Sequence, residues 1–305
     1  MRKTNLLLVL ILSFILLSAQ EKTIKVSSFN VRNENSNDAA NGNGWTNRYP
    51  EIANIILFHD LDIVGTQECK SNQITDLLSV LSKYNYNYIG RGRGTNPTDD
   101  EYSAIFYKTD KYKLMDSGNF WLSETPDIPS KGWDAALNRI CTWGKFKDKS
   151  THFVFYVFNL HMDHQGKEAR RLSSELVIKE IKEITKGKPV VLTGDFNTDQ
   201  FAEGYKIITN SETLMDSYTA AKIIHDPNGT FNGFDINNTT NQRIDHIFIS
   251  NHFTTLRYGI LTDIYWTDKS GIANHPRDFP DESTVCVGKP RMPSDHYPIV
   301  VVVKY

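Results

Sequence analysis

The amino-acid sequence predicts an α/β fold in which strands and helices form a layered sandwich. Seven apolar runs have the length of β-strands, and three longer segments between them have the periodicity of helices. The strand-like runs cover residues 24–30, 62–67, 104–107, 153–160, 190–194, 244–250 and 298–304. The helical segments cover about 49–59, 71–83 and 167–186.

The first two runs end at polar residues. Residues 24–30 alternate apolar and polar side chains with a period of two and end at Asn30. The short apolar run 62–67 is followed directly by Glu68. An amide oxygen and a carboxylate are hard oxygen ligands of the kind that Mg²⁺ and Mn²⁺ prefer, so these two strand ends are candidates for a metal site.

The later runs also carry polar residues at their ends. Runs 153–160 and 190–194 lead into such residues, and runs 244–250 and 298–304 start from them. The residues concerned are His161, Asp195, Asn197, Asp245, Asp295 and His296. Because strand ends are rigid, they can aim polar groups into a cleft, so this pattern indicates an active site.

The longest helical segment, 167–186, is amphipathic. Its apolar residues Leu172, Leu176, Ile181 and Ile184 lie on one helical face, with charged residues elsewhere. A helix with one apolar face is predicted to cover a sheet with that face.

Residues 1–19 have the pattern of a secretory signal peptide. Arg2 and Lys3 precede the stretch 6–17, which is apolar except for Ser13, and the small residues Ser18 and Ala19 follow. The apolar stretch is short for a membrane span, and an uncleaved anchor is the alternative. We therefore expect an exported protein, periplasmic or extracellular, without a transmembrane span in the mature chain. No proline- or glycine-rich linker divides residues 20–305, which are expected to form a single domain.

The charge balance argues against tight binding to duplex nucleic acid. Removal of Arg2 and Lys3 with the signal peptide lowers the basic count from 34 to 32 against 36 acidic residues, a formal charge of −4. The chain has no cluster of Lys and Arg of the kind that neutralises duplex phosphates. The sequence leaves the oligomeric state open, and three free thiols are preferred over a disulfide between Cys141 and Cys286.

The sequence resembles the endonuclease/exonuclease/phosphatase superfamily in an ordered set of residues. The set is Asn30, Glu68, His161, Asp195 with Asn197, Asp245, and Asp295 with His296. The resemblance runs from about residue 24 to residue 304. It implies a DNase I-like four-layer α/β sandwich, with two packed and mostly antiparallel sheets flanked by helices. The strings 139–143 and 161–171 are loosely similar to exported bacterial members related to the nocturnin-like deadenylases.

The resemblance also implies a role for each residue of the set. The metal-binding residues would be Asn30, Glu68 and Asp295. Asp195 would orient or deprotonate the attacking water, Asn197 would steady the phosphate, and His296 would face the scissile phosphate. Asp245 would orient His296, and His161 would contact the phosphate as a second histidine.

These roles imply a phosphoesterase that depends on Mg²⁺ or Mn²⁺ and cleaves its ester by attack of water. A phosphodiester is the preferred substrate at this point, with a phosphomonoester of a sugar or inositol as the alternative. A non-catalytic binding module that retained the fold is the third hypothesis. A Ser-His-Asp hydrolase is not supported because the sequence has no Gly-x-Ser-x-Gly turn, and zinc at His161 and His164 is disfavoured because no helical metal motif follows.

Candidate substrate-binding residues come from the intervening loops. Arg91, Arg93 and Arg139 have guanidinium groups suited to phosphate, and Tyr102 has a ring suited to stacking. The long segments 33–47, 225–242 and 262–293 each adjoin a site residue, and long loops in compact domains are usually functional. We therefore expect these loops to wall a pocket for a small or terminal phosphate ester.

Overall fold

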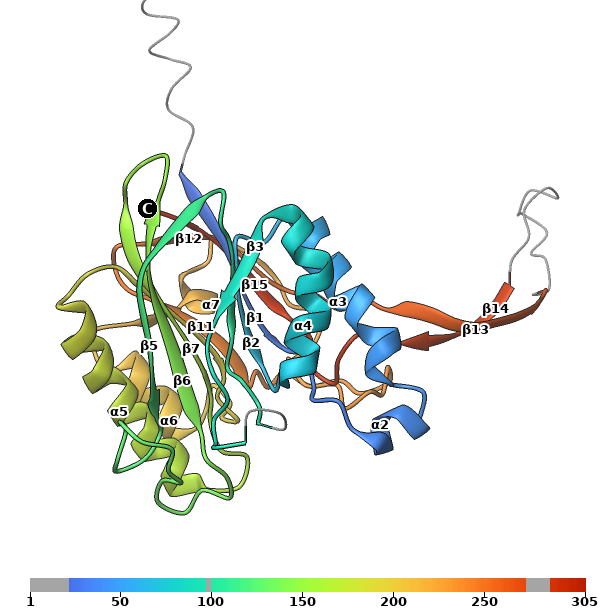
Figure 1. Ribbon diagram of the computed structural model, residues 1–305, viewed down its shortest axis with the longest axis horizontal. Helices are drawn as coiled ribbons and strands as arrows, with labels where there is room; N and C mark the ends of the chain where they lie inside the picture. The colour runs from blue at the N-terminus through green and yellow to red at the C-terminus, as the bar shows by residue number, and fades with distance from the viewer. Residues whose placement is uncertain (1–21, 97–99, 273–285) are drawn as a thin grey trace, which may run out of the picture.

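The computed structural model describes residues 22–96, 100–272 and 286–305. Two β-sheets lie face to face, and helices cover the outer face of each, which makes four layers (Figure 1). The predicted α/β sandwich with mostly antiparallel sheets is therefore confirmed. The predicted signal peptide, residues 1–19, lies outside the described residues.

The first sheet has seven strands, and their order across it is β10-β12-β15-β1-β2-β4-β3. Its β1–β2 and β10–β12 pairs are parallel, and its other pairs are antiparallel. In that order the strands are β10 (Ile223–His225), β12 (Thr254–Ile260), β15 (Ile299–Lys304), β1 (Thr23–Asn30), β2 (Ile63–Gln67), β4 (Ile105–Lys108) and β3 (Tyr86–Ile89).

The second sheet has six strands in the order β5-β6-β7-β8-β11-β9. Only its β7–β8 pair is parallel among the described strands. In order the strands are β5 (Tyr112–Trp121), β6 (Ile140–Asp148), β7 (Val154–His161), β8 (Val190–Asp195), β11 (Asp245–Ile249) and β9 (Met215–Asp216).

Helices cover both outer faces. Helices α3 (Trp45–Phe58) and α4 (Ser71–Leu81) pack on the first sheet, and α5 (Lys167–Thr185) and α6 (Glu203–Thr209) pack on the second. The shorter helices are α2 (Ser36–Ala40), α7 (Ser217–Ala220) and the 3₁₀ turn η1 (Ser82–Tyr84). Within the described ranges, no helix has the length and apolar character needed to cross a bilayer.

Helix α5 covers the second sheet as predicted, with a face that overlaps the predicted one in part. Val177, Ile178 and Ile181 belong to the core on that sheet, Ile184 packs against it, and Ser173 and Ser174 are also buried. Leu172 and Leu176 are only partly buried, so the buried face is shifted from the predicted one. The small serines let the helix lie close to its neighbours. The sequence prediction counted only Leu and Ile as the buried face, so it did not include these serines.

All seven predicted apolar runs form strands, as β1, β2, β4, β7, β8, β11 and β15. The strands that the sequence did not predict lie mainly at the sheet edges or in the projecting hairpin. Strand β5, at one edge, is buried only at its two ends, and the second half of β6 alternates buried with partly exposed residues, two of them lysines. Such strands carry charged residues on their solvent side, and a search for continuous apolar runs passes over them.

The described part of the segment 262–293, residues 262–272 and 286–293, does not wall the site, contrary to the expectation for this segment. Its described part forms a two-stranded hairpin of β13 (Tyr265–Ile272) and β14 (Cys286–Arg291). This hairpin projects away from the sandwich on the side of α2 and α3 (Figure 1). All three cysteines are free, as preferred, with Cys69 and Cys141 buried and Cys286 exposed.

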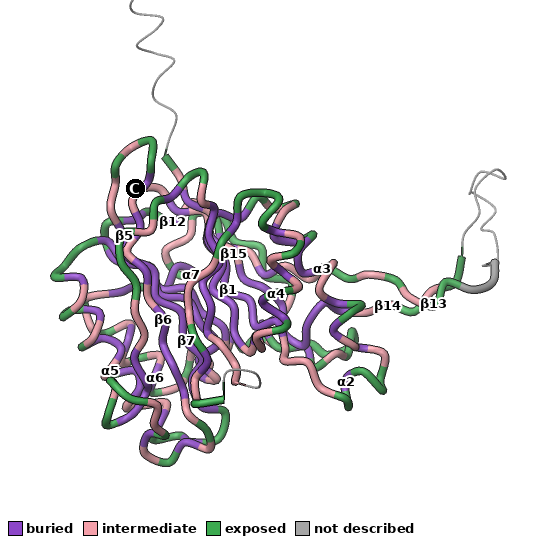
Figure 2. The backbone as a smooth tube through the Cα atoms, viewed as in Figure 1, coloured by how far each residue is buried: buried purple, intermediate pink, exposed green. Residues whose placement is uncertain are grey.

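Most strand residues of the two sheets are buried (Figure 2), and apolar side chains from both sheets pack into one core. Near the end that carries the polar residues, the amide of Asn159 on β7 joins the two sheets. Its Nδ2 donates to the carbonyl oxygens of Thr66 (2.8 Å) and Ala104 (2.9 Å), which belong to the first sheet. Its Oδ1 accepts from Gln67 Nε2 (2.7 Å) and from Thr193 Oγ1 (3.0 Å). The buried amide is thus fully hydrogen-bonded, which makes its burial tolerable and fixes the two sheets relative to each other.

This contact requires a glycine on the first sheet. A Cβ added to Gly65 on β2 would overlap the Thr193 hydroxyl and the Asn159 amide. Gly65 therefore permits the close approach of β2 to β7 and β8.

Gly65→Ala is expected to lower the free energy of unfolding by about 1–3 kcal/mol, because a methyl group in this contact overpacks the core. The matched control is Gly259→Ala on β12, where an added Cβ would meet only the His225 carbonyl oxygen at 3.8 Å. That control should be neutral or slightly stabilising. Urea unfolding at an unchanged m-value measures both, and equal midpoints for the two variants would contradict the proposed contact.

Candidate active site

Polar residues from both sheets meet at one edge of the sandwich. The strand register brings them there, because Asp245 on β11 pairs with Asp195 on β8, and Asp195 pairs with His161 on β7. On the other sheet, Asn30 at the end of β1 pairs with Gln67, the residue before Glu68. The predicted strand ends are therefore neighbours in space.

Asn30 connects the two sheets within this group. Its Nδ2 donates to Glu68 Oε1 (3.0 Å) and to Asp195 Oδ2 (3.0 Å). Its Oδ1 accepts from the backbone N–H of Arg32 (2.9 Å), which fixes the orientation of the amide. One buried amide thus sets the separation of a carboxylate from each sheet.

Glu68 is held as a carboxylate. Its φ of 65° lies in the left-handed region, which turns the chain sharply at the end of β2. Asn33 donates to Glu68 Oε2 from its backbone N–H (3.0 Å) and from its Nδ2 (2.8 Å). Burial alone would raise the pKa of Glu68, but the bonds from Asn30 and Asn33 and the charges of His296 and Arg32 hold it below its usual value.

The residues present fit a hard divalent cation. Burial, together with the negative charge of Glu68, raises the pKa of Asp295, so a cation near this pair would stabilise both carboxylates. A positive group already lies there, since Arg32 Nη1 is 3.6 Å from Asp295 Oδ2 and 4.0 Å from Glu68 Oε2. The two carboxylates match the oxygen donors that Mg²⁺ or Mn²⁺ takes, and the Asn30 amide, which here turns its Nδ2 toward Glu68, would offer its Oδ1 to an ion by turning over. Ligand atoms of Glu68, His161 and Asp195 also lie within 4.8 Å of one another. Glu68 therefore lies both near Asp295 and near the pair of His161 and Asp195.

His296 is held by two carboxylates. Its Nδ1 lies 2.9 Å from Asp245 Oδ2, and its Nε2 lies 3.8 Å from Asp195 Oδ2. Burial would lower the pKa of His296, but the charges of Asp245 and Asp195 raise it well above the usual value. The imidazole is therefore protonated at neutral pH and presents a positive N–H next to Asp195.

Asp195 is the carboxylate most suited to accept a proton. Burial, and then the charge of Asp245, raises its pKa to about 7. Its Oδ1 accepts from the backbone N–H of Asn197 (2.9 Å), which fixes the rotamer. A carboxylate with a pKa near neutrality can take a proton from water and release it again at the working pH.

His161 and Asn197 form a neutral pair beside this acid. Asn197 Nδ2 donates to His161 Nε2 (3.2 Å) and to the Met162 carbonyl oxygen (3.0 Å). Burial, together with the nearby charges of Arg139 and Arg93, holds the pKa of His161 well below its usual value. The imidazole is therefore neutral and available as a hydrogen-bonding group.

These side chains open into a cavity of about 330 Å³. Its lining is Arg32, Asn33, Glu68, Arg93, Glu101, Leu137, Arg139, His161, His164, Asp195, Asn197, Phe231, Asp295 and His296. Larger hollows of about 690 and 680 Å³ lie elsewhere, and only Asn197 of the site lines either of them. The smaller cavity is the candidate active site, because among these three cavities it alone is lined by Glu68, Asp195, Asp295, His161 and His296.

Arg139 lies in the wall of this cavity with one donor unused. Its side chain is anchored from Nε to Asp163 Oδ2 (3.2 Å) and from Nη2 to His164 Nδ1 (2.9 Å). Its Nη1 is buried and has no hydrogen-bond partner among the described residues. A buried guanidinium N–H without an acceptor is costly, so this donor is suited to a ligand.

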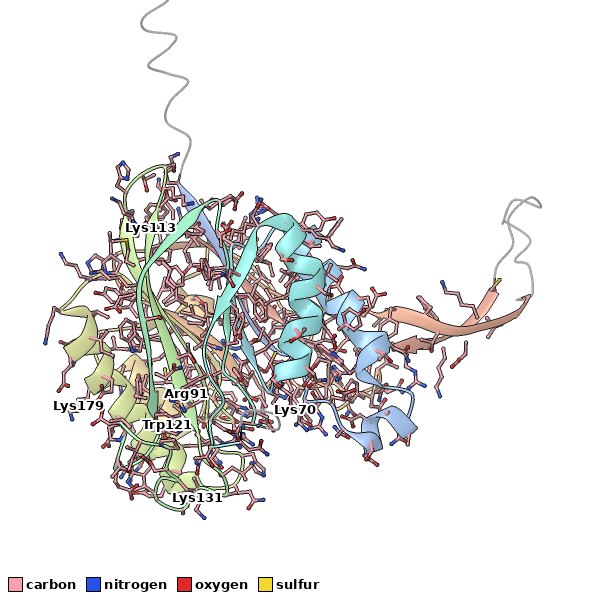
Figure 3. All side chains as sticks on the ribbon, viewed as in Figure 1. Lys70, Arg91, Lys113, Trp121, Lys131 and Lys179 are labelled. Atoms are coloured by element: carbon pink, nitrogen blue, oxygen red, sulfur yellow. The ribbon has the colours of Figure 1, made fainter. Side chains whose placement is uncertain are left out.

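The structure does not bring Arg91 and Tyr102 into the cavity lining. The Arg91 guanidinium lies over the ring of Trp121 at 5.1 Å, and both residues are labelled near the lower end of the second sheet in Figure 3. Tyr102 is bridged by its backbone to Cys69 and Gly92. From that loop, Arg93 and Glu101 line the cavity instead.

Asn33 and Phe231 come from the segments 33–47 and 225–242 that were expected to wall the pocket, whereas the lining residues Arg32, Leu137 and Glu101 were missed from the sequence. Arg32 and Asn33 follow Asn30 in a sharp turn, and the φ of 58° at Arg32 directs the chain back over Glu68. Their closeness to Asn30 in the chain was the available signal. Phe231 lay within the long segment 225–242, where nothing in the sequence distinguished it.

Comparisons with known proteins agree with this geometry. A model of the endonuclease/exonuclease/phosphatase family matches residues 27–296. A mannosyl-6-phosphatase from Bacteroides thetaiotaomicron is 47% identical, with a TM-score of 0.84 over 92% of this chain and 100% of that one. A family protein from Bacteroides vulgatus is 36% identical, with a TM-score of 0.79 over 93% and 99% of the two chains. The human nocturnin catalytic domain shares the fold at 18% identity, with a TM-score of 0.67 over 93% and 97%.

The charge on His296 gives a test of this geometry. In the metal-free protein, the His296 imidazole should remain protonated well above pH 6.5. Asp245→Asn should lower the pKa of His296, because the charge of Asp245 makes the largest contribution that raises it. Since the folded-state pKa lies above the unfolded one, the stability due to this group is complete below about pH 6.5 and is lost as pH rises through the folded pKa. Histidine NMR titration, with His296→Gln to assign the signal, measures the shift. A wild-type signal that titrates near pH 6.5 would show that the pairing is absent.

Proposed function

The chain belongs to the endonuclease/exonuclease/phosphatase family, and from this membership we propose that it is a divalent-metal-dependent phosphoesterase that removes a terminal phosphate from a sugar. The family name itself covers nucleases and phosphatases, so membership supports hydrolysis of a phosphate ester and leaves the substrate to the site. One relative, at 47% identity, is described as a mannosyl-6-phosphatase.

The observation that carries the choice of a terminal phosphate is the unused Nη1 of Arg139 in the wall of a small cavity. A phosphomonoester has three non-bridging oxygens and up to two negative charges, since its second pKa is about 6. A diester has fewer free oxygens and one charge. The protonated His296 and the Arg139 donor therefore favour the monoester, and we propose it in place of the diester preferred from the sequence.

Asn30, Glu68 and Asp295 are the residues that would hold Mg²⁺ or Mn²⁺. When bound, the ion would act as a Lewis acid that neutralises charge on the phosphate oxygens. Hydrogen bonds from Asn30 and Asn33 keep Glu68 ionised and oriented for this task.

The remaining groups of the site act on water and on the ester. Asp195, with a pKa of about 7, orients the attacking water and accepts its proton. His296, held by Asp245, donates to a phosphate oxygen and stabilises the charge that develops there. Asn197 holds neutral His161 beside Asp195 through the His161 Nε2, and Arg139 Nη1 binds another phosphate oxygen.

We place this activity outside the cytoplasm, in the periplasm or the extracellular medium, because of the pattern in residues 1–19. N-terminal sequencing of the mature protein checks this proposal. A start near Gln20 is expected, and recovery of the protein in the cytoplasm with residues 1–19 intact would oppose it.

The substrate proposal is tested by steady-state kinetics on mannose 6-phosphate, p-nitrophenyl phosphate and bis(p-nitrophenyl) phosphate. Both monoesters should be hydrolysed with a higher kcat/KM than the diester, and chelation should remove the activity. Arg139→Met should lower kcat/KM for the monoesters roughly 10- to 100-fold, the effect of losing a charged hydrogen bond. The control is Arg171→Met on the exposed face of α5. A preference for the diester, or activity that survives exhaustive chelation, would reject the proposal.

The assigned roles are tested by two shape-conserving variants. Asp195→Asn should lower turnover by roughly 10²–10⁴-fold while leaving the fold intact, because it removes a positioned proton acceptor. Glu68→Gln should require a higher Mg²⁺ or Mn²⁺ concentration to reach its own maximum rate. Asp116→Asn and Glu124→Gln, at exposed positions, are the matched controls. An unchanged metal titration in Glu68→Gln would remove Glu68 from the metal site.

A further inference from the structure

Two charged residues in the cavity, Arg93 and Glu101, have no part in the chemistry described so far. We propose that Arg93 and Glu101, together with the ring of Phe231, bind the hydroxyl groups and ring of a sugar and so select sugar phosphates over other monoesters. This inference rests on the proposed function and adds to it the residues that recognise the leaving group.

Arg93 and Glu101 form an ion pair that a ligand can reach. Arg93 Nη1 lies 2.8 Å from Glu101 Oε2, and the side chains retain 15% and 16% of their exposure. Both residues line the cavity that holds Asp195 and His296. Glu101 Oε1 receives one long hydrogen bond, from Asn33 Nδ2 at 3.3 Å, and a carboxylate oxygen has room for a second donor.

The chemistry of this pair matches adjacent hydroxyl groups. A guanidinium only donates hydrogen bonds and a carboxylate only accepts them, whereas each sugar hydroxyl does both. Neighbouring hydroxyls on one ring can therefore accept from Arg93 and donate to Glu101 at the same time. An aryl leaving group without hydroxyls satisfies neither residue.

The pair is held rigidly relative to the metal-binding residues. Tyr102 donates its backbone N–H to the Cys69 carbonyl oxygen (2.7 Å), which ties the residue after Glu101 to the residue after Glu68. Arg93 N–H donates to the Glu101 carbonyl oxygen (3.0 Å), and Trp121 Nε1 donates to the Arg93 carbonyl oxygen (2.6 Å). Asn33 Nδ2 also donates to both Glu68 and Glu101. A preformed donor and acceptor at fixed positions lowers the cost of binding and favours one sugar orientation.

Phe231 supplies an apolar surface in the same cavity. It is 45% exposed although it is a large apolar side chain, and its ring meets the His296 ring edge to face with centroids 5.1 Å apart. Its backbone also forms a β-bridge with His296. An exposed aromatic ring can pack against the C–H face of a sugar, and this position lies beside the group assigned to the phosphate.

The inference predicts a loss that depends on the leaving group. Glu101→Gln keeps the shape of the side chain but removes its charge, and it should lower kcat/KM for mannose 6-phosphate roughly 10-fold or more, the cost of a charged hydrogen bond. The same variant should change kcat/KM for p-nitrophenyl phosphate less than about 3-fold, because that leaving group offers no hydroxyl. Arg93→Lys should show the same difference in the same direction. Glu124→Gln, at an exposed position, is the matched control and should affect neither ester.

Three results would overturn the inference. Equal losses on both esters would show that Glu101 acts in the chemistry, and no loss on mannose 6-phosphate would show that it does not contact the sugar. A higher Mg²⁺ requirement of Glu101→Gln with p-nitrophenyl phosphate would show that Glu101 belongs to the metal site instead.

Binding separates this inference from the proposed function. In the Asp195→Asn variant with Mg²⁺ present, calorimetry should show tighter binding of mannose 6-phosphate than of inorganic phosphate, and adding Glu101→Gln should remove the difference. If the wild-type protein hydrolyses neither monoester, the proposed function fails and this comparison still decides the inference. Equal affinities for the two ligands in Asp195→Asn would overturn it.

Discussion

The amide of Asn159 lies buried between the sheets, and its four hydrogen bonds reach Thr66, Gln67 and the Ala104 carbonyl on one side and Thr193 on the other. Because all its donors and acceptors are used, any sliding of the sheets would leave buried polar groups unpaired. Gly65 keeps the backbones close enough for these bonds. The ends of β2 and β8 are therefore fixed relative to each other, and with them the carboxylates of Glu68 and Asp195.

At the edge of the sandwich, the Asn30 amide continues this connection into the active site by donating to both of those carboxylates. Around it, positive and negative groups alternate. Arg32 lies near Glu68 and Asp295, and His296 lies between Asp195 and Asp245. Burial raises the pKa of both acids, but hydrogen bonds from Asn30 and Asn33 bring that of Glu68 below its usual value, whereas the charge of Asp245 adds to the rise in that of Asp195. A carboxylate kept ionised suits a metal ligand, and a carboxylate with a pKa near 7 suits a proton acceptor.

The cavity walls divide the proposed recognition of substrate between two sets of residues. Arg139 has a buried donor, Nη1, without a hydrogen-bond partner among the described residues. Arg93 and Glu101 form an ion pair with each other and can also form hydrogen bonds with hydroxyl groups. Phosphate needs donors and positive charge, while a sugar needs donors and acceptors together. The hairpin β13–β14 takes no part in the described lining, so the enclosure comes from the turns at Arg32 and Asn33 and at residues 137–139, from Arg93 and Glu101, and from Phe231.

The sequence by itself determined the sandwich, its seven most apolar strands and the ordered set from Asn30 to His296, because buried strands leave continuous apolar runs and polar strand ends interrupt them visibly. It did not determine the edge strand β5 or the buried face of α5, since charged residues in the first and serines in the second weaken the apolar pattern. Nor did it distinguish Arg93 from Arg91 or find Glu101 and Phe231. Whether such a residue lines the cavity depends on which side of its loop faces the cavity. Tertiary contacts fix this orientation, such as those of Tyr102 with Cys69 and of Arg91 with Trp121. Loop side chains follow no period that a sequence displays, so their direction is fixed only when the packed strands on either side are in place.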